Sequence, residues 1–196
     1  FDGNNKWMLS ANGTIFTYEY EAIIPGLLKR WYAERQEMQQ KMRDCGDNEI
    51  EREYWDKRQL VKKINLNSLY GAILNPGCRF FDIRIGQSVT LTGRCITKHM
   101  ASKVNEIVAG KYDHKGESIV YGDTDSVYFT AHRTLKKEIQ QGSIPWTKDS
   151  VVSLYDKISD EVNGSFKAFM TKAFHTPSTR GEVIKAGREL VASKGL

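Results

Sequence analysis

The chain has 196 residues, 40% hydrophobic and 27% charged, which is enough to bury a core and is not the composition of a disordered protein. Its formal net charge of +5 suits a polyanionic partner such as nucleic acid, although many basic proteins bind none. No apolar run reaches the roughly 20 residues of a membrane span, no signal-peptide pattern is found, and the three cysteines lack a C-x-x-C pair, so we expect no membrane anchor and a reducing compartment such as the cytoplasm.

The first part of the sequence predicts a short hairpin and then two long helices. Residues 8–20 hold an Asn-Gly turn signal between β-prone stretches. Apolar residues recur at helical spacing over 27–43 and again over 49–74, with the polar sequence 45–48 between them. An Asn-Pro-Gly sequence at 75–77 ends the second helix. Two long helices joined by so short a turn should pack as an antiparallel hairpin.

The middle of the sequence predicts a helix followed by two strands. Residues 78–87 look irregular or briefly extended, and Ser88 can cap a helix that runs to about Ala109. The expected inner stripe of that helix comprises Val89, Ile96, Met100, Val104 and Ile107. A loop over 110–117 then leads to residues 118–130, whose pattern indicates a strand, an acidic turn and a second strand.

The last part of the sequence predicts one long helix over 149–174 and a final strand over 183–192. Residues 133–148 are polar and predict no element. The elements together indicate an α+β fold, in which a helical hairpin lies beside a small antiparallel sheet that is backed by helices.

The acidic turn, Asp123–Ser126, carries the strongest chemical signal. Side chains two apart on an extended segment point the same way, so Asp123 and Asp125 can present carboxylates to one small volume. Two such charges favour a hard cation, and Mg²⁺ takes one or two protein carboxylates and completes its shell with water and phosphate oxygens. The alternative is an exposed hairpin tip without a function, because Gly-Asp and Asp-x-Asp sequences are common in turns. The flanking apolar residues should bury and hold the turn rigidly: Ile119, Val120, Val127, Tyr128 and Phe129.

A polar stripe on the second helix of the hairpin carries the next signal. Lys63, Asn67 and Tyr70 share one face at about 100° per residue, with Gly71 at its edge. A lysine can meet a triphosphate, a tyrosine offers a flat face to a base pair, and glycine permits close approach. Arg35 on the preceding helix can point at the same groove. A solvated helix face would look the same. Three apolar residues lie away from that stripe and can pack against the partner helix: Leu60, Ile64 and Leu69.

Between these two motifs, over residues 79–103, the chain is rich in cations and contains Asp82 as its single acidic residue. Such an excess suits a sugar–phosphate backbone, and a solvated helix face explains any one of them equally well. The residues concerned are Arg79, Arg84, Arg94, Lys98 and Lys103.

The two motifs, taken in order, resemble those of family B DNA polymerases. Lys63-x-x-x-Asn67-Ser68-x-Tyr70-Gly71 resembles the fingers-helix motif, and Tyr121-Gly122-Asp123-Thr124-Asp125-Ser126 resembles the palm motif. The stretch 9–14 and the helix around Arg35 further resemble the T-even-like tailed-phage branch. The resemblance is weakest from about residue 133 to residue 187.

The resemblance implies a role for each motif residue. Asp125 would ligate the catalytic metals, with Asp123 nearby. Lys63 and Arg35 would hold the incoming triphosphate, while Asn67 would support the pocket and Tyr70 would line its floor. The implied reaction is template-directed attack of a primer 3′-hydroxyl on a deoxynucleoside triphosphate during DNA replication. Residues 1–20 would then be the segment on the palm side that leads into the fingers. Residues 21–76 would form the fingers, and residues 77–196 would form part of the palm.

The sequence also departs from the family pattern. It contains no aspartate followed by Ser-Leu-Tyr-Pro, the palm motif whose carboxylate completes the two-ion Mg²⁺ site. The exonuclease, thumb and lysine–tyrosine palm segment are not found either, and both ends read as cuts inside a longer polypeptide. Glu189 could be an additional carboxylate. We therefore expect the chain to need those segments, in the same or a second polypeptide, together with primer–template DNA and nucleotides.

Two other interpretations remain beside this one. A non-catalytic DNA-binding remnant of a palm polymerase would keep the fold, but it has no chemical reason to retain Lys63, Asn67, Asp123 and Asp125 together. A reverse transcriptase would better suit a Tyr-x-Asp-Asp turn than the Asp-Thr-Asp found here.

Overall fold

A computed structural model describes residues 5–192 and divides the chain into two compact units. One unit comprises residues 17–87, and the other comprises the residues on either side, with the boundary inside the helix α3 (Ile83–Ala109). Mostly helical, with two small antiparallel sheets, the fold is α+β, as predicted. Within the described range no helix is both long and apolar enough to cross a membrane.

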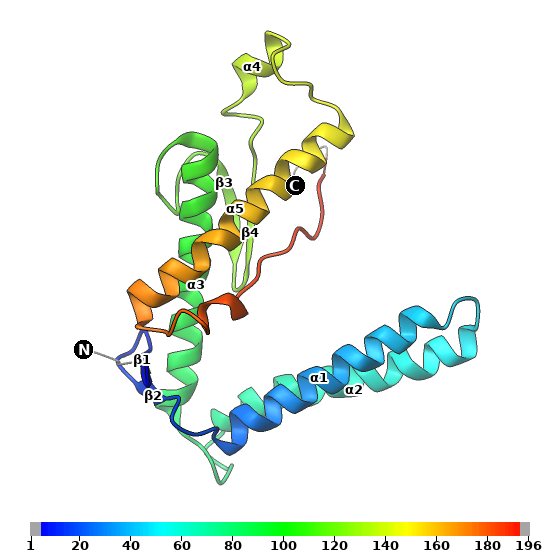
Figure 1. Ribbon diagram of the computed structural model, residues 1–196, viewed down its shortest axis with the longest axis vertical. Coiled ribbons are helices and arrows are strands. Elements are labelled where there is room, and N and C mark those ends of the chain that lie inside the picture. Colours follow the sequence, from blue (N-terminus) through cyan, green and yellow to red (C-terminus); the bar gives the residue numbers. More distant parts are fainter. Residues whose placement is uncertain (1–4, 193–196) are drawn as a thin grey trace. The chain divides into compact units, whose positions relative to one another are not determined.

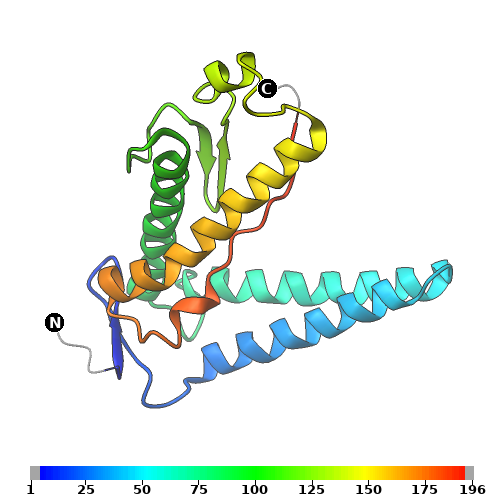
Figure 2. The ribbon, with the colours of Figure 1, turned by 45° about the horizontal axis from the view of Figure 1, so that its top comes forward.

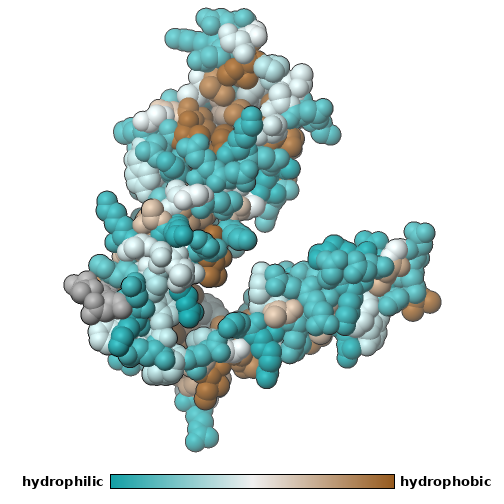
Figure 3. All heavy atoms as spheres, viewed as in Figure 1, coloured by the Kyte–Doolittle hydropathy of each residue, from teal (hydrophilic) through white to brown (hydrophobic). Residues whose placement is uncertain are grey.

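The unit of residues 17–87 is built around the helical hairpin that the sequence predicts. Helices α1 (Ile23–Asp44) and α2 (Glu49–Ile73) lie side by side (Figures 1 and 2). Glu34 pairs with Lys62 at 2.5 Å, whereas further along α1 the Lys41 ammonium lies 4.8 Å from the centroid of the Trp55 ring. Residues later in α1 therefore contact residues earlier in α2, which shows that the two helices are antiparallel. Its visible face is predominantly hydrophilic (Figure 3).

Local chemistry explains where the two helices begin and end. Pro25 lies in the first turn of α1, where its missing N–H costs no helical hydrogen bond. Gly46 in the connecting turn has φ +54°, a left-handed conformation that glycine adopts without strain. The Asn48 side chain then caps α2 by accepting from the backbone N–H of Glu51 at 3.2 Å.

The face of α2 that meets α1 differs from the one expected. Trp55, Gln59 and Lys62 make the contacts to α1, at spacings of four and three residues. Leu60 and Ile64 lie outside that stripe and are 46% and 55% exposed, so the prediction that they pack on the partner helix is wrong. Long polar side chains replace them because their aliphatic stems cover apolar surface while their heads form hydrogen bonds and ion pairs.

Helix α3 begins earlier than predicted, at Ile83, and Ser88 is buried in its interior. The cap is Asp82, whose Oδ1 accepts from the backbone N–H of Arg84 at 2.9 Å. The Arg84 guanidinium also donates to the Asp82 carboxylate, and this hydrogen bond lowers the pKa of Asp82 from 3.8 to about 2. An aspartate immediately before an apolar stretch was an equally good capping signal.

The other unit holds the strands and the remaining helices. Its elements are β1 (Trp7–Leu9), β2 (Ile15–Thr17), the larger part of α3, β3 (Ile119–Asp123), β4 (Ser126–Phe129), α4 (Lys136–Gln140), α5 (Lys148–Phe174) and a 3-10 turn at Gly181–Val183. β1 pairs with β2, and β3 with β4. The first hairpin, the second hairpin and the long C-terminal helix are as the sequence predicts, whereas α4 is additional.

The core of this unit forms where α3, α5 and one face of the β3–β4 hairpin meet. Four buried residues make its centre: Val104, Ile158, Val162 and Phe166. Ile96, Met100 and Ile107 of the predicted α3 stripe pack against them. Val89 is 53% exposed, so the prediction that it belongs to the inner stripe is wrong.

The second hairpin is less buried than expected. Ile119 and Phe129 pack on the core, as predicted, while Val120 and Tyr128 are 56% and 44% exposed. The reason is geometric, because a two-stranded sheet with alternating side chains can place only one face on the helices.

The segment that follows α5 forms no strand. Residues 184–192 have no regular secondary structure, in contrast to the strand predicted over 183–192. Asn163 of α5 takes the place of a strand partner: its amide donates to the backbone oxygen of Ala186 at 2.9 Å and accepts from the Ala186 N–H at 2.7 Å. A side chain from a distant helix thus satisfies the backbone that a sheet would have paired.

Candidate metal-binding turn and nucleotide-facing helix

The acidic turn connects β3 directly to β4. Asp123 pairs with Ser126 across the hairpin, which leaves Thr124 and Asp125 as a two-residue loop. Thr124 has φ +39°, a left-handed conformation that is unusual for a β-branched residue. Two contacts stabilise the turn internally: the Thr124 hydroxyl donates to Asp123 Oδ1 at 3.0 Å, and the Ser126 hydroxyl donates to the Asp123 backbone oxygen at 3.2 Å.

Asp125 lies in the turn itself, whereas Asp123 is the last residue of β3. The argument from alternation along an extended strand therefore does not apply to this pair. Both residues are exposed, and within residues 5–192 neither carboxylate forms an ion pair. Two acidic side chains at a hairpin tip that form no ion pair with the described residues retain their capacity for a hard cation.

The acidic turn offers carboxylate oxygens, which suit Mg²⁺, but only two residues supply them. Carboxylate oxygens are the ligands this ion prefers, and one or two of them suffice when phosphate and water complete the shell. The described part of the chain contains no group of three or more potential metal ligands. Asp123 and Asp125 could therefore hold a metal ion only with ligands from a substrate or from other protein segments.

The polar stripe on α2 keeps its predicted face. Lys63 and Asn67 are exposed and form no hydrogen bond or ion pair with any described residue. Tyr70 is half-buried, and its hydroxyl donates to the backbone oxygen of Gly86 at 3.3 Å. A Cβ on Gly71 would meet no atom within 4 Å, so an approaching ligand has room there. Arg35 lies on the α2-facing side of α1, where its Nε donates to Gln59 Oε1 at 3.2 Å.

The acidic turn and the α2 stripe belong to different compact units. Each group of residues is therefore described within its own unit.

The predicted DNA-contacting cations divide into two classes. Arg79, Arg94 and Lys98 are exposed and have no hydrogen-bond or ion-pair partner in the part of the chain that the structure describes. Arg84, in contrast, is held by Asp82 at 2.8 Å, and Lys103 pairs with Glu106 at 2.7 Å. The first class keeps its full charge available to an external anion.

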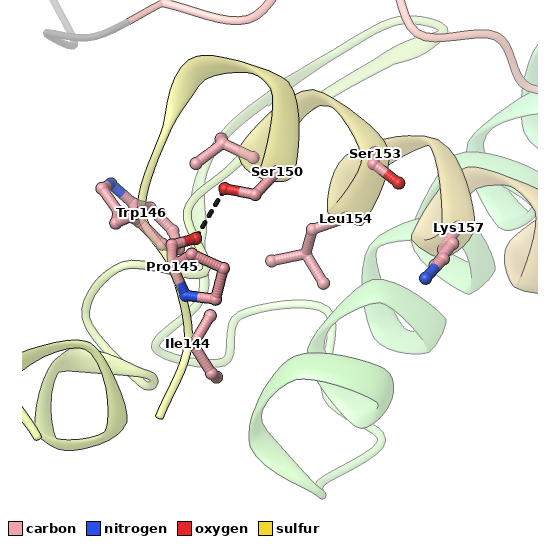
Figure 4. Close-up of a pocket in the computed structure, with 8 residues that line it drawn as sticks. Ile144, Pro145, Trp146, Ser150, Ser153, Leu154 and Lys157 are labelled. Carbon is pink, nitrogen blue, oxygen red and sulfur yellow. Dashed lines mark hydrogen bonds between the residues drawn. The ribbon is translucent and has the colours of Figure 1, made fainter. Parts of the chain in front are cut away.

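A pocket of about 260 Å³ lies elsewhere, between the start of α5 and the segment before it (Figure 4). Leu154 and Lys157 line one side, and Pro145 and Trp146 line the other. The Ser150 hydroxyl donates to the Pro145 backbone oxygen at 2.5 Å and ties the segment to the helix. None of the predicted site residues lines this pocket.

One contact at the acidic turn was missed by sequence reasoning. Thr97 of α3 donates its hydroxyl to the backbone oxygen of Thr124 at 2.8 Å. No sequence signal could have found it, because Thr97 lies 27 residues before the turn and belongs to no motif.

Comparison with known proteins identifies the family. The model of DNA polymerase family B matches residues 4–171, which include both the α2 stripe and the acidic turn. The chain is 30% identical over 179 residues to a DNA polymerase of Pyrococcus glycovorans, covering 90% of this chain and 22% of the relative. It is 38% identical over 80 residues to the DNA-directed DNA polymerase of Escherichia phage RB69, and 39% identical over 82 residues to that of Enterobacteria phage T4. Both matches cover 40% of this chain and 9% of the relative.

These relatives are much longer than the present sequence, which spans less than a quarter of their length. The family model nevertheless covers most of the chain, and the residues that first suggested the family lie inside the matched range. The chain belongs to DNA polymerase family B.

Proposed function

We propose that this chain supplies the fingers and part of the palm of a replicative DNA polymerase. The reaction is template-directed addition of deoxynucleotides to a primer 3′-hydroxyl. The observation that carries the proposal is the family match over residues 4–171, which includes the acidic turn and the α2 stripe in the order the family requires. In this assignment residues 1–20 lead in from the palm, 21–76 are the fingers and 77–196 belong to the palm.

Asp125, with Asp123 beside it, is the protein's contribution to a two-ion Mg²⁺ site. When bound, the ions stabilise the attacking and leaving oxygens of phosphoryl transfer. The two side chains suit this role because they are exposed and form no ion pair with any described residue, and because they lie on either side of Thr124 in the turn. A further carboxylate has to come from another polymerase segment, since this sequence has no Asp-Ser-Leu-Tyr-Pro motif.

The α2 stripe is the surface for the incoming nucleotide. Lys63 meets the triphosphate as an unpaired cation, and Asn67 offers its amide beside it. Tyr70 presents its ring to the new base pair while its hydroxyl is held by Gly86, and Gly71 leaves room for close approach. Arg35 assists with the triphosphate through its terminal N–H groups, while its Nε–H donates to Gln59.

Primer–template DNA binds the unpaired cations Arg79, Arg94 and Lys98, with Arg84 contributing less because Asp82 neutralises it. The remaining polymerase segments act in the same or a second polypeptide, and the chain alone does not polymerise. We place it in the T-even-like phage branch and in the cytoplasm of the host cell. The 38% and 39% identities to phage polymerases over a short range support that placement.

Primer extension with Mg²⁺ and four deoxynucleotides tests the proposal, using the chain alone and with a polypeptide that supplies the other palm strand, exonuclease and thumb. Activity is expected only in the mixture. Asp125→Asn should lower the rate more than about a hundredfold, since metal ions supply several kcal/mol of transition-state stabilisation. Asp47→Asn, at an exposed position between α1 and α2, is the matched control.

The result separates the proposal from its alternative. Turnover by the Asp125→Asn mixture at the rate of the Asp47→Asn control would contradict the metal assignment. DNA binding without extension in any mixture would favour the non-catalytic remnant.

A further inference from the structure

The acidic turn is tied to the rest of its unit by one side chain of α3. The Thr97 hydroxyl lies 2.8 Å from the backbone oxygen of Thr124 and 3.2 Å from that of Gly93 in its own helix. A hydroxyl has one proton to donate, so the two oxygens compete for it, and the shorter distance favours Thr124. Thr97 thus connects the middle of α3 to the first residue of the two-residue loop.

This connection acts on Asp125 through the geometry of the peptide bond. The Thr124 carbonyl lies in the same rigid plane as the N and Cα atoms of Asp125. Holding that oxygen therefore restricts where the Asp125 Cα lies and, through it, the carboxylate. A hydrogen bond to the Thr124 side chain would have no such effect.

The turn needs an external support because its other contacts are internal. Thr124 is held at φ +39°, which a β-branched residue rarely adopts, and the hydroxyls of Thr124 and Ser126 bond only to Asp123. The nearby Val120 and Tyr128 are exposed and do not pack the tip against α3. Among residues 5–192, Thr97 is the one side chain outside the hairpin that donates to the backbone of the turn.

We propose that Thr97 is a positioning residue for the metal-binding turn, which orients Asp125 for the cation without ligating it. This inference rests on the proposed metal-binding function of Asp123 and Asp125. Thr97 is itself partly exposed, so its substitution leaves the buried core of α3 and α5 intact.

The test uses Mn²⁺ as a probe for the Mg²⁺ site in the full 196-residue chain, mixed with the polypeptide that supplies the other palm segments and with a deoxynucleoside triphosphate, because these provide the remaining metal ligands. Paramagnetic broadening of the backbone amide signals of residues 124–126 reports binding at the turn itself, without any need for catalysis. Thr97→Val keeps the side-chain shape and removes the hydroxyl, and it should weaken Mn²⁺ binding about fivefold and raise the mobility of those amides. Thr97→Ser restores the hydroxyl and should bind within about twofold of the wild-type chain.

Two further variants make the outcomes distinguishable. Thr171→Val changes an exposed threonine of α5 whose hydroxyl has no partner among the described residues, and it should bind Mn²⁺ as the wild-type chain does. Asp125→Asn should lose site-specific broadening; if it does not, the proposed metal function fails. If Asp125→Asn loses binding while Thr97→Val matches Thr171→Val, the positioning role of Thr97 fails. Thr97→Ala replaces Thr97→Val should the valine prevent folding.

Discussion

At the scale of single residues, lysines on α2 differ in whether a carboxylate already neutralises them. Lys57 pairs with Glu53 at 2.6 Å, one helical turn away, and this hydrogen bond raises its pKa. Lys63 lies on the same helix with no such partner among the residues described. An unpaired exposed cation gains more from an anionic ligand because it has no ion pair to break.

Replacement of Lys63 by alanine should therefore weaken nucleotide use specifically. A charge-assisted hydrogen bond is worth about 1.5–3 kcal/mol, so we expect the nucleotide KM of the complete polymerase to rise about tenfold to a hundredfold. Lys57→Ala is the matched control and should leave the KM unchanged. Steady-state primer extension over a range of nucleotide concentrations measures both, and equal KM values for the two variants would exclude Lys63 from the triphosphate site.

His99 is the residue whose titration bears on folding. It is buried between α3 and α5, with Nδ1 2.8 Å from the Tyr112 hydroxyl and Nε2 2.9 Å from the Ser165 hydroxyl. Ser165 donates its own proton to the Val162 backbone oxygen at 2.6 Å, so it accepts from Nε2–H and leaves Nδ1 as an acceptor. Burial, and then the charge of Lys103, lower the pKa of His99 from its ordinary value of 6.5.

The stability of the chain should therefore fall as the pH is lowered below about 6.5. In that range the unfolded chain binds a proton that folded His99 resists, so the stability is fully present above the unfolded pKa and is lost below it. Urea unfolding at several values between pH 7.5 and pH 5 measures the slope before most carboxylates titrate. His99→Phe should flatten the slope, and the loop variant His114→Gln should retain it. An unchanged slope in His99→Phe would assign the pH dependence to other groups.

At the scale of elements, a buried asparagine shapes the loop that leads from α3 into β3. Asn105 donates to the Lys111 backbone oxygen at 2.7 Å, and its Oδ1 accepts from the Ser118 N–H at 3.2 Å. Asn105 is 1% exposed, and a Cβ on Gly116 would overlap its side chain. A glycine is thus required at position 116, because the Asn105 side chain lies too close for a Cβ. The loop in turn positions the start of β3, the strand that ends at Asp123.

Gly116→Ala should destabilise the chain by about 1–3 kcal/mol. The new methyl group displaces the Asn105 amide, which leaves buried backbone groups without partners. Gly187→Ala is the matched control, because a Cβ there meets no atom within 4 Å. Chemical denaturation followed by circular dichroism measures the free energies of unfolding. Equal values for the two variants would show that the loop adapts without loss of the asparagine contacts.

At the scale of the whole molecule, the net charge is +5, and the cations behind it fall into two groups. Some form ion pairs with nearby carboxylates, and others do not. Lys29, Lys41 and Lys57 each pair with a glutamate, at 3.3, 2.8 and 2.6 Å. Arg79, Arg94 and Lys98 lack such partners in the described part of the chain. A polyanion would therefore be bound through the second set, with release of its counterions.

Replacing Arg79, Arg94 and Lys98 by alanine should lower the salt dependence of duplex DNA binding. Each phosphate contact contributes about 0.9 to the slope of log K against log salt, so the slope should fall in magnitude by about 2.7. Replacing Lys29, Lys41 and Lys57 changes the net charge equally and should leave the slope nearly unchanged. Fluorescence anisotropy at 50–200 mM salt measures it. If both triple variants shift the slope alike, only net charge matters.

Sequence reasoning succeeded where the determining interactions are local. The helices α1, α2 and α5 and both hairpins follow from apolar spacing, capping residues and turn signals within a few residues of each other. It failed where a partner is distant or where two local signals compete. Asp82 caps α3 in place of the predicted Ser88, and the segment after α5 satisfies its backbone through Asn163 instead of a strand.

The candidate site divides in the same way. Residue type and spacing alone identified the acidic turn and the stripe of Lys63, Asn67 and Tyr70, because a helix or hairpin fixes the relation of residues close in sequence. Only the tertiary structure decided which face of α2 meets α1, that Asp82 neutralises Arg84, and that Thr97 supports the turn at Thr124. Those contacts join residues through folded geometry, where several polar groups compete for the same partner and sequence order does not choose among them.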